Sequence, residues 1–162
     1  MAEFGLSYQL LYTNSESFHI VVNDVKVTFF EYPYLINLQL VMFKKSLSNI
    51  PSFIAGDKTI IKEFVHPKND AVDLNYSLAH ATVEVGEASE PHILTKNSEL
   101  YVILSGEGEL FIEKEVEILR GGDAALVPAG ATQWIRNVGV VPLVFYVVVS
   151  PPWNEEQEIV FE

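Results

Sequence analysis

The sequence of 162 residues is 49% hydrophobic, which suits a single domain of ordinary size with a full hydrophobic core. Its ten basic and twenty-two acidic side chains give a formal net charge of -12, which repels phosphate backbones, so nucleic acid is excluded as an expected partner. Because cysteine is absent, disulfides and thiolate metal ligands are excluded as well.

Residues 1–41 are predicted to form an N-terminal extension that contains a β-hairpin. Residues 18–22 and 25–30 are rich in β-branched and aromatic side chains, and Asn23 and Asp24 between them suit a tight turn because both residue types tolerate positive φ. Two strands by themselves are only marginally stable in water. We therefore expect the hairpin to pack on the following domain or on a neighbouring subunit.

The same part of the chain contains no signal for secretion or membrane insertion. It lacks a basic segment followed by a long apolar run, and the apolar stretch at residues 34–43 is short and interrupted by Asn37 and Gln39. We expect a cytoplasmic protein that has no membrane partner.

From about residue 42 onward, short runs of β-forming residues alternate with turn residues, which predicts an all-β domain over residues 42–162. Glycines and a proline stand where the strands are expected to end. Strands at such regular spacing are typical of a β-sandwich or a small closed barrel. The acidic residues 154–162 are expected on the surface or over the barrel mouth. The predicted strands include residues 77–85, 101–104, 110–112, 124–127 and 143–149.

Two glycine-anchored motifs place polar residues at regular positions in this domain. Side chains alternate between the two faces of a strand. Three strands are thus expected to point His92, Glu99 and Gln133 toward a common interior, together with the residues that share their faces: Leu94, Tyr101, Ile103 and Ile135. The motifs read Gly86-x5-His92-x-Leu94-x4-Glu99-x6-Gly106 and Gly122-x5-Pro128-x-Gly130-x2-Gln133-x3-Asn137.

These two motifs resemble the signature motifs of the cupin superfamily. The stretch from about Met42 to Trp153 is similar to small single-domain cupins of the conserved-barrel type, known as cupin 2. The resemblance implies a double-stranded β-helix, or jelly-roll barrel, over residues 42–162, with residues 1–41 as an added β extension. Two of the three histidines usual in these motifs are replaced here by Leu94 and Gln133.

The resemblance implies a metal site in which His92 and Glu99 match two ligands, Gln133 takes the place of a third, and Leu94 removes a fourth. The ion would be one divalent metal such as Mn, Fe, Ni or Zn. One imidazole, one carboxylate and one amide still form a three-ligand set with open positions, as catalysis by a metal requires. The alternative is a site without any cofactor, in which Glu99 and Gln133 hydrogen-bond each other.

Several further residues are candidates for the same cavity. Glu99 is a candidate general base, and Tyr101 could orient a substrate or transfer a proton, although it is equally well explained as an aromatic core residue. His80 could supply a missing imidazole if its face of the strand looks inward, and is otherwise a structural histidine. His66, before Pro67 in an expected turn, is interpreted as a surface histidine. Ile103 and Ile135 are expected to line the apolar part of the ligand pocket.

Two functions fit this pattern. One is a metal-dependent enzyme that acts on a sugar or a small carboxylate, with isomerase- or epimerase-like chemistry. The alternative is a cupin that binds a small ligand without turnover, at a degenerate or metal-free site. The outward-facing Leu100, Val102, Leu104 and Trp134 indicate an apolar barrel exterior, which predicts a homodimer.

Overall fold

The computed structural model describes residues 8–14, 17–22, 25–30 and 42–161, and contacts divide the chain into units Met1–Lys44 and Lys45–Glu162. In the first unit, β1 (Tyr8–Asn14), β2 (Ser17–Val22) and β3 (Val25–Phe30) form an antiparallel sheet in the order β1-β2-β3. The predicted hairpin strands are β2 and β3, and β1 adds a third strand. Residues 23–24 lie outside the described residues, and packing of the extension on another body stays a prediction.

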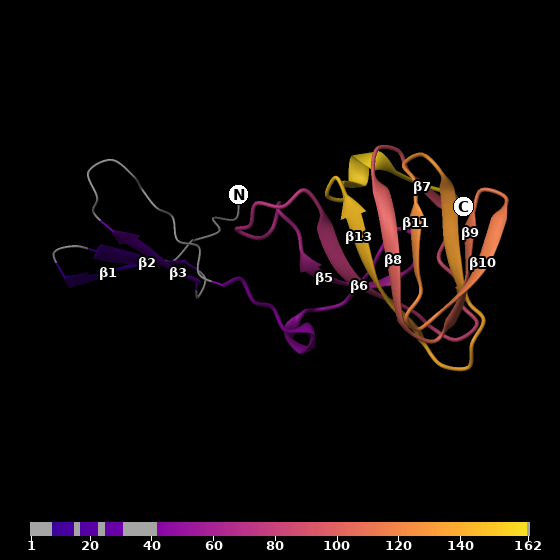
Figure 1. Cartoon of the computed structure of the whole chain (residues 1–162), viewed down its shortest axis with the longest axis horizontal. Helices are drawn as coiled ribbons and strands as arrows, with labels where there is room; N and C mark the ends of the chain where they lie inside the picture. The colour runs from indigo at the N-terminus through magenta and orange to yellow at the C-terminus, as the bar shows by residue number, and fades with distance from the viewer. Residues whose placement is uncertain (1–7, 15–16, 23–24, 31–41, 162) are drawn as a thin grey trace. The chain divides into compact units, whose positions relative to one another are not determined.

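The second unit consists of two antiparallel sheets that enclose one core (Figure 1). The five-stranded sheet has the order β10-β9-β12-β7-β14, and the six-stranded sheet has the order β11-β8-β13-β6-β5-β4. This is the jelly roll that the resemblance implies. The strands are β4 (Phe53–Ile54), β5 (Ile60–Val65), β6 (Ser77–Val83), β7 (His92–Leu94), β8 (Ser98–Ser105), β9 (Glu107–Ile112), β10 (Glu115–Arg120), β11 (Ala124–Val127), β12 (Thr132–Asn137), β13 (Leu143–Ser150) and β14 (Glu158–Val160).

Helical structure in the described residues is confined to two short 3-10 turns, η1 (Leu47–Asn49) and η2 (Glu155–Gln157). Asn154 caps η2 by accepting a hydrogen bond from the Glu156 backbone N–H at 3.1 Å. Among the described residues, no helix has the length and apolar character that a membrane span requires.

Strict alternation of burial along the central strands confirms the predicted inward faces. In β8, Glu99, Tyr101 and Ile103 are buried while their neighbours are not. The same pattern places Gln133 and Ile135 inside along β12. Burial of apolar side chains between two sheets is the main stabilising term of such a fold. The core cluster comprises Ala81, Val83, Tyr101, Ile103, Leu110, Leu119, Val127, Ala131, Ile135, Leu143, Phe145 and Val147.

The apolar exterior predicted from the sequence is divided between the two sheets. Trp134 lies on β12 of the five-stranded sheet, where its ring stacks on Phe111 with centroids 4.4 Å apart. Leu100, Val102 and Leu104 lie on β8 of the six-stranded sheet. The four residues therefore belong to the outer sides of two different sheets, because strand parity assigns a side but not a sheet. The homodimer stays a prediction.

Gly106, in the turn between β8 and β9, provides a test of close backbone packing. Its φ is +87°, and an added Cβ would lie 2.8 Å from both Leu143 Cα and the Pro142 carbonyl oxygen. Gly86 has a similar φ of +79° but open space around the Cβ position. We expect Gly106→Ala to lower the free energy of unfolding by about 3 kcal/mol, and Gly86→Ala by about 1 kcal/mol from φ alone.

Urea unfolding of the two alanine variants beside the wild type measures both losses. Since Gly86 shares the backbone conformation but not the crowding, the difference between the variants reports the contact with Leu143 and Pro142. Equal losses would contradict a steric role for this turn.

Candidate functional site

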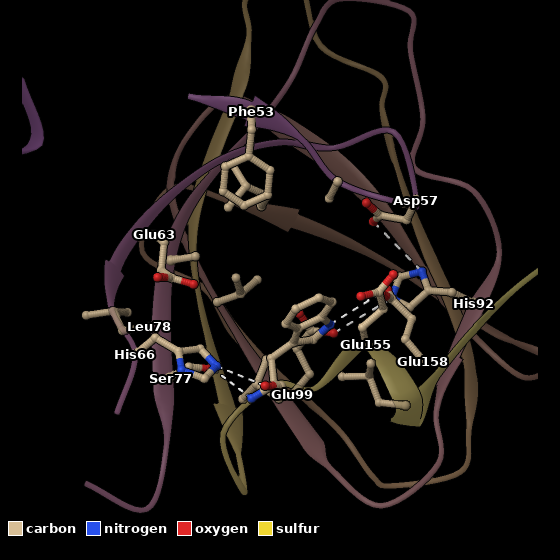
Figure 2. Close-up of a pocket in the computed structure, with 18 of the residues that line it drawn as sticks. Phe53, Asp57, Glu63, His66, Ser77, Leu78, His92, Glu99, Glu155 and Glu158 are labelled. Atoms are coloured by element: carbon tan, nitrogen blue, oxygen red, sulfur yellow. Dashed lines mark hydrogen bonds and ion pairs between the residues drawn. The ribbon is translucent and has the colours of Figure 1, made fainter. Parts of the chain in front are cut away.

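A cavity of about 310 Å³ lies at the end of the domain where β6 begins and β13 ends (Figure 2). The register explains its position, because Val149 of β13 is paired with both Ser77 of β6 and Glu99 of β8. All three residues line the cavity, as do His92 and Leu94 of β7. The remaining lining comes from Leu78, Ala79 and Val147 on the same strands, from residues 53–66 and from residues 153–158.

The three predicted site residues converge on one carboxylate oxygen. His92 and Gln133 face each other on the neighbouring strands β7 and β12, and Glu99 reaches them from the opposite sheet. Gln133 Nε2 donates a hydrogen bond of 2.6 Å to Glu99 Oε2. His92 Nε2 lies 3.8 Å from the same oxygen. The hydrogen bond that the cofactor-free alternative requires is therefore present.

The His92 ring is oriented by its other nitrogen. His92 Nδ1 lies 2.9 Å from the Glu90 carbonyl oxygen, to which it donates, and 3.9 Å from Asp57 Oδ2. Burial by itself lowers the pKa of His92, but Glu99, the Glu90 carbonyl and Asp57 outweigh it and raise the pKa to about 9. His92 is therefore an imidazolium at neutral pH and faces the Glu99 carboxylate.

Tyr101 lies behind this cluster in the core. Its side chain is 3% exposed and stacks on Phe145 with centroids 5.3 Å apart. Burial, followed by the negative charge of Glu99, raises the pKa of the Tyr101 phenol well above its usual range. Tyr101 is thus a permanently protonated neighbour of Glu99, but it is not among the residues that line the cavity.

The structure places three other candidates away from the cavity. Ile103 and Ile135 are 2% and 1% exposed and pack in the core, so the expectation that they line the ligand pocket is corrected. His80 lies on the opposite face of β6 from the buried Ala81, and its ring forms a T-shaped pair with the Tyr146 ring, with centroids 5.8 Å apart. Burial and then Lys62 lower the pKa of His80. His80 therefore belongs to the outer face of the sheet.

His66, expected at the surface, is 5% exposed and lines the cavity. Its Nδ1 accepts from the Lys68 backbone N–H at 3.1 Å, and its Nε2 donates to the Trp153 carbonyl oxygen at 2.9 Å. Both ring nitrogens are engaged, so His66 is a neutral structural residue that joins the residues after β5 to the C-terminal segment.

Sequence reasoning also missed most of the acidic and aromatic lining. Asp57, Glu63 and Phe53 come from the segment before β6, and Trp153, Glu155 and Glu158 from the C-terminal segment. None of them lies in a motif. The acidity of residues 154–162 was the available signal, since it suggested a segment over the barrel mouth. Figure 2 shows Glu63 and Asp57 on opposite sides of the cavity, with Phe53 between them at the top of the view.

The residues as placed do not make the three-donor metal site that the resemblance implies. His92 Nε2 and Glu99 Oε2 face one another, but Gln133 presents its NH2 group to Glu99, while its Oε1 is buried without a hydrogen-bond partner. No group of three or more His, Cys, Asp or Glu residues in the described part of the chain is placed to hold a metal ion. The geometry fits a hydrogen-bonded cluster better than a coordination sphere.

Comparisons with known proteins agree with this fold. A family model described as Cupin domain matches residues 79–149. An uncharacterized protein of Methanocaldococcus jannaschii is 31% identical over 121 residues, which cover 75% of this chain and 96% of the relative. Mannose-1-phosphate guanylyltransferase of Escherichia coli is 26% identical over 121 residues and 72% of this chain. This chain spans only 25% of the length of that enzyme.

Two solved structures show the same architecture at low sequence identity. A protein of Thermotoga maritima described as a predicted oxalate decarboxylase has 19% identity and a TM-score of 0.61, over 67% of this chain and 99% of that chain. The Streptomyces nucleoside dehydratase Pac13 has 17% identity and a TM-score of 0.62, over 75% of this chain and 92% of that chain. At these identities the likeness concerns the fold alone.

The His92–Glu99 pair makes stability dependent on pH. The pKa of His92 is about 9 in the folded protein against an ordinary 6.5. The pair's contribution is fully present below about pH 6.5 and is lost as the pH rises through about 9. We expect the free energy of unfolding to decline over this window, and the decline to be smaller in Glu99→Gln. Urea unfolding at several pH values, with an NMR titration of the His92 ring, checks this, and a midpoint near 6.5 would refute the pairing.

The position of Leu94 leads to a second expected outcome. Leu94 is 3% exposed, shares the inward face of β7 with His92 and lines the cavity. Leu94→His should place a second imidazole beside His92 and increase the affinity for Mn²⁺ or Zn²⁺ by at least about tenfold. Calorimetric titration of the variant and the wild type measures the gain. If the affinity does not change, the side chain at position 94 does not reach the His92–Glu99 pair.

Proposed function

The chain belongs to the cupin superfamily, and on that premise we propose that it is an acid–base enzyme of isomerase or epimerase type that acts on a small organic molecule of about sugar size. The observation that carries the proposal is the buried His92–Glu99 pair, whose facing atoms are 3.8 Å apart at the wall of the cavity. A cavity of about 310 Å³ is at the small end of the range for ligand pockets. Cavity size and acid–base pair together favour proton transfer on a compact substrate.

The two members of the pair suit complementary roles. Glu99 would accept a proton from a carbon next to a carbonyl group, and the imidazolium of His92 would donate a proton to the oxygen that gains charge. Glu99 then returns its proton to a neighbouring carbon, or to the other face of the same carbon, while His92 takes a proton back from an oxygen of the intermediate, which completes an isomerisation or epimerisation and restores the pair. Gln133 would hold the Glu99 carboxylate in position through its 2.6 Å hydrogen bond. No step in this scheme requires a metal.

A ligand-binding protein without turnover is the second candidate function, and the same hydrogen bond favours it. A carboxylate that already accepts from Gln133 and faces an imidazolium is satisfied without a substrate. In that case the pair would orient a bound molecule, and the cavity would serve for recognition alone. Only a measurement of turnover separates the two functions.

Solvent exchange provides that measurement. Wild-type protein is incubated in D2O with a panel of aldoses, ketoses, amino sugars and 2-hydroxy carboxylates, and NMR follows loss of the proton next to the carbonyl group. We expect exchange for at least one class, and a rate lower by about 100-fold or more in Glu99→Gln. Glu117→Gln, an exposed change on β10, is the matched control and should keep the wild-type rate.

The outcome decides between the candidate functions. Exchange that survives in Glu99→Gln would contradict the assigned base. Binding without exchange across the whole panel would contradict the enzyme and favour the ligand-binding protein.

A further inference from the structure

The cavity carries an excess of negative charge. Five carboxylates line it, and among the described residues that line it there is no lysine or arginine. His92 is the only lining residue expected to be positively charged, because both nitrogens of His66 are engaged as in a neutral ring. The lining carboxylates are Asp57, Glu63, Glu99, Glu155 and Glu158.

Three lysines that are close in sequence to lining residues have partners that do not line the cavity. Lys58, next to Asp57, is paired with Glu90, which does not line the cavity. Lys45 is paired with Asp70 at 2.6 Å. Lys62 donates to the Leu47 carbonyl oxygen at 3.3 Å and influences His80 on the outer face of the sheet. Among the described residues, the side chains that line the cavity therefore carry more negative than positive charge.

The pKa of Glu158 reflects the negative charge of the cavity. Glu158 is partly buried and accepts a hydrogen bond of 3.2 Å from Trp153 Nε1. Burial, with Asp57 and Glu99 adding to it, raises the pKa of Glu158, although His92 and Trp153 oppose the shift. Ionised Glu158 thus lacks a full counter-charge, and a bound cation would supply one.

The rest of the lining is apolar and includes exposed aromatic rings. Phe53 is 51% exposed and Trp153 is 38% exposed. Rings that face a negatively charged cavity present π-electron surfaces that attract organic cations. Deeper in the cavity, Leu94, Val147 and Val149 form an apolar wall. The occupant that fits these surroundings has both a positive charge and an apolar body.

Behind the cavity wall, Gln133 has an acceptor that no residue in the described part of the chain satisfies. Gln133 Oε1 is buried without a hydrogen-bond partner, on the same amide whose Nε2 donates to Glu99. A buried acceptor without a donor is costly, so this part of the cluster is not fully satisfied by the chain's own groups. Gln133 does not itself line the cavity, so the charge class of the ligand is argued from the lining carboxylates and aromatic rings.

We propose that the cavity binds a small organic ammonium ion with an apolar or sugar-sized body, held by Glu158, Glu155 and Glu99 and by the rings of Phe53 and Trp153. The proposal deepens the proposed function by naming the charge class of the ligand, and rests on that function only for the cavity as the binding site. An inorganic cation fits less well, because in the described part of the chain these carboxylates do not converge as a metal site. A phosphorylated or carboxylate ligand would meet like charges.

Three matched probes test the charge class: benzylammonium, benzyl alcohol and benzoate, which share a ring and differ in charge. Ligand-observed NMR and calorimetry at neutral pH measure the affinity of the full chain for each. We expect benzylammonium to bind at least about tenfold more tightly than the alcohol, and benzoate not to bind. Added salt should weaken the ammonium complex.

Two variants and a control locate the site. Glu158→Gln keeps the shape and an acceptor for Trp153 Nε1, and it should weaken benzylammonium on the order of tenfold. Glu155→Gln, at an exposed position on η2, should also weaken the binding of benzylammonium. It provides a second test if Glu158→Gln does not fold. Glu156→Gln, one residue along the same turn and not part of the lining, should bind as the wild type does.

Several results would overturn the proposal. They are equal or tighter binding of the alcohol or benzoate, no binding of benzylammonium at millimolar concentration, and displacement of the ammonium by micromolar Mg²⁺ or Ca²⁺. Because the probes carry no carbonyl group, these measurements do not depend on turnover. If the protein selects ammonium ions but catalyses no proton exchange, the proposed ligand class is supported and the proposed enzyme is contradicted. If it catalyses exchange but does not select ammonium ions, the enzyme is supported and the ligand class is contradicted.

Discussion

The site depends on how the buried Glu99 carboxylate is held between the two sheets. Glu99 comes from the six-stranded sheet, whereas its partners Gln133 and His92 come from the five-stranded sheet. A carboxylate removed from water is tolerated only when charge or hydrogen bonds replace the lost solvation. The cluster therefore joins the sheets at the end where the cavity lies, and it aligns the residues that a ligand would meet.

The two departures from the cupin motifs change what this carboxylate can do. Leu94 brings an apolar side chain to the cavity wall in place of an imidazole, and Gln133 brings an amide whose NH2 group binds Glu99. With one histidine left, the pair of His92 and Glu99 becomes an imidazolium and a carboxylate rather than two metal donors. In the functions proposed above, this position would serve proton transfer or the recognition of a cation, and Glu99 would act through its charge.

Much of the fold could be predicted from the alternation of side chains along the strands and from the turn residues. The position of each residue along the barrel and the sheet to which each strand belongs could not. Parity along β8 and β12 correctly gave the inward faces of Glu99, Tyr101 and Gln133. It failed for the cavity positions of Ile103 and Ile135, because parity says nothing of height along the barrel. For His80, parity did not decide which face of β6 looks inward, since this strand carries alanines on one side and mixed residues on the other. Packing selected the small Ala81 for the interior.

The sequence by itself determined the fold class, the inward faces of the central strands and the convergence of His92, Glu99 and Gln133, because these follow from a period of two and from turn geometry that are local properties of the chain. Only the tertiary structure decided the character of the cavity. Apart from Glu99, its carboxylates and the rings of Phe53 and Trp153 come from residues 53–66 and 153–158, which are far apart in sequence and share no motif. They meet because the chain path brings both segments to the same end of the domain, and the potential of the cavity is the sum of their charges.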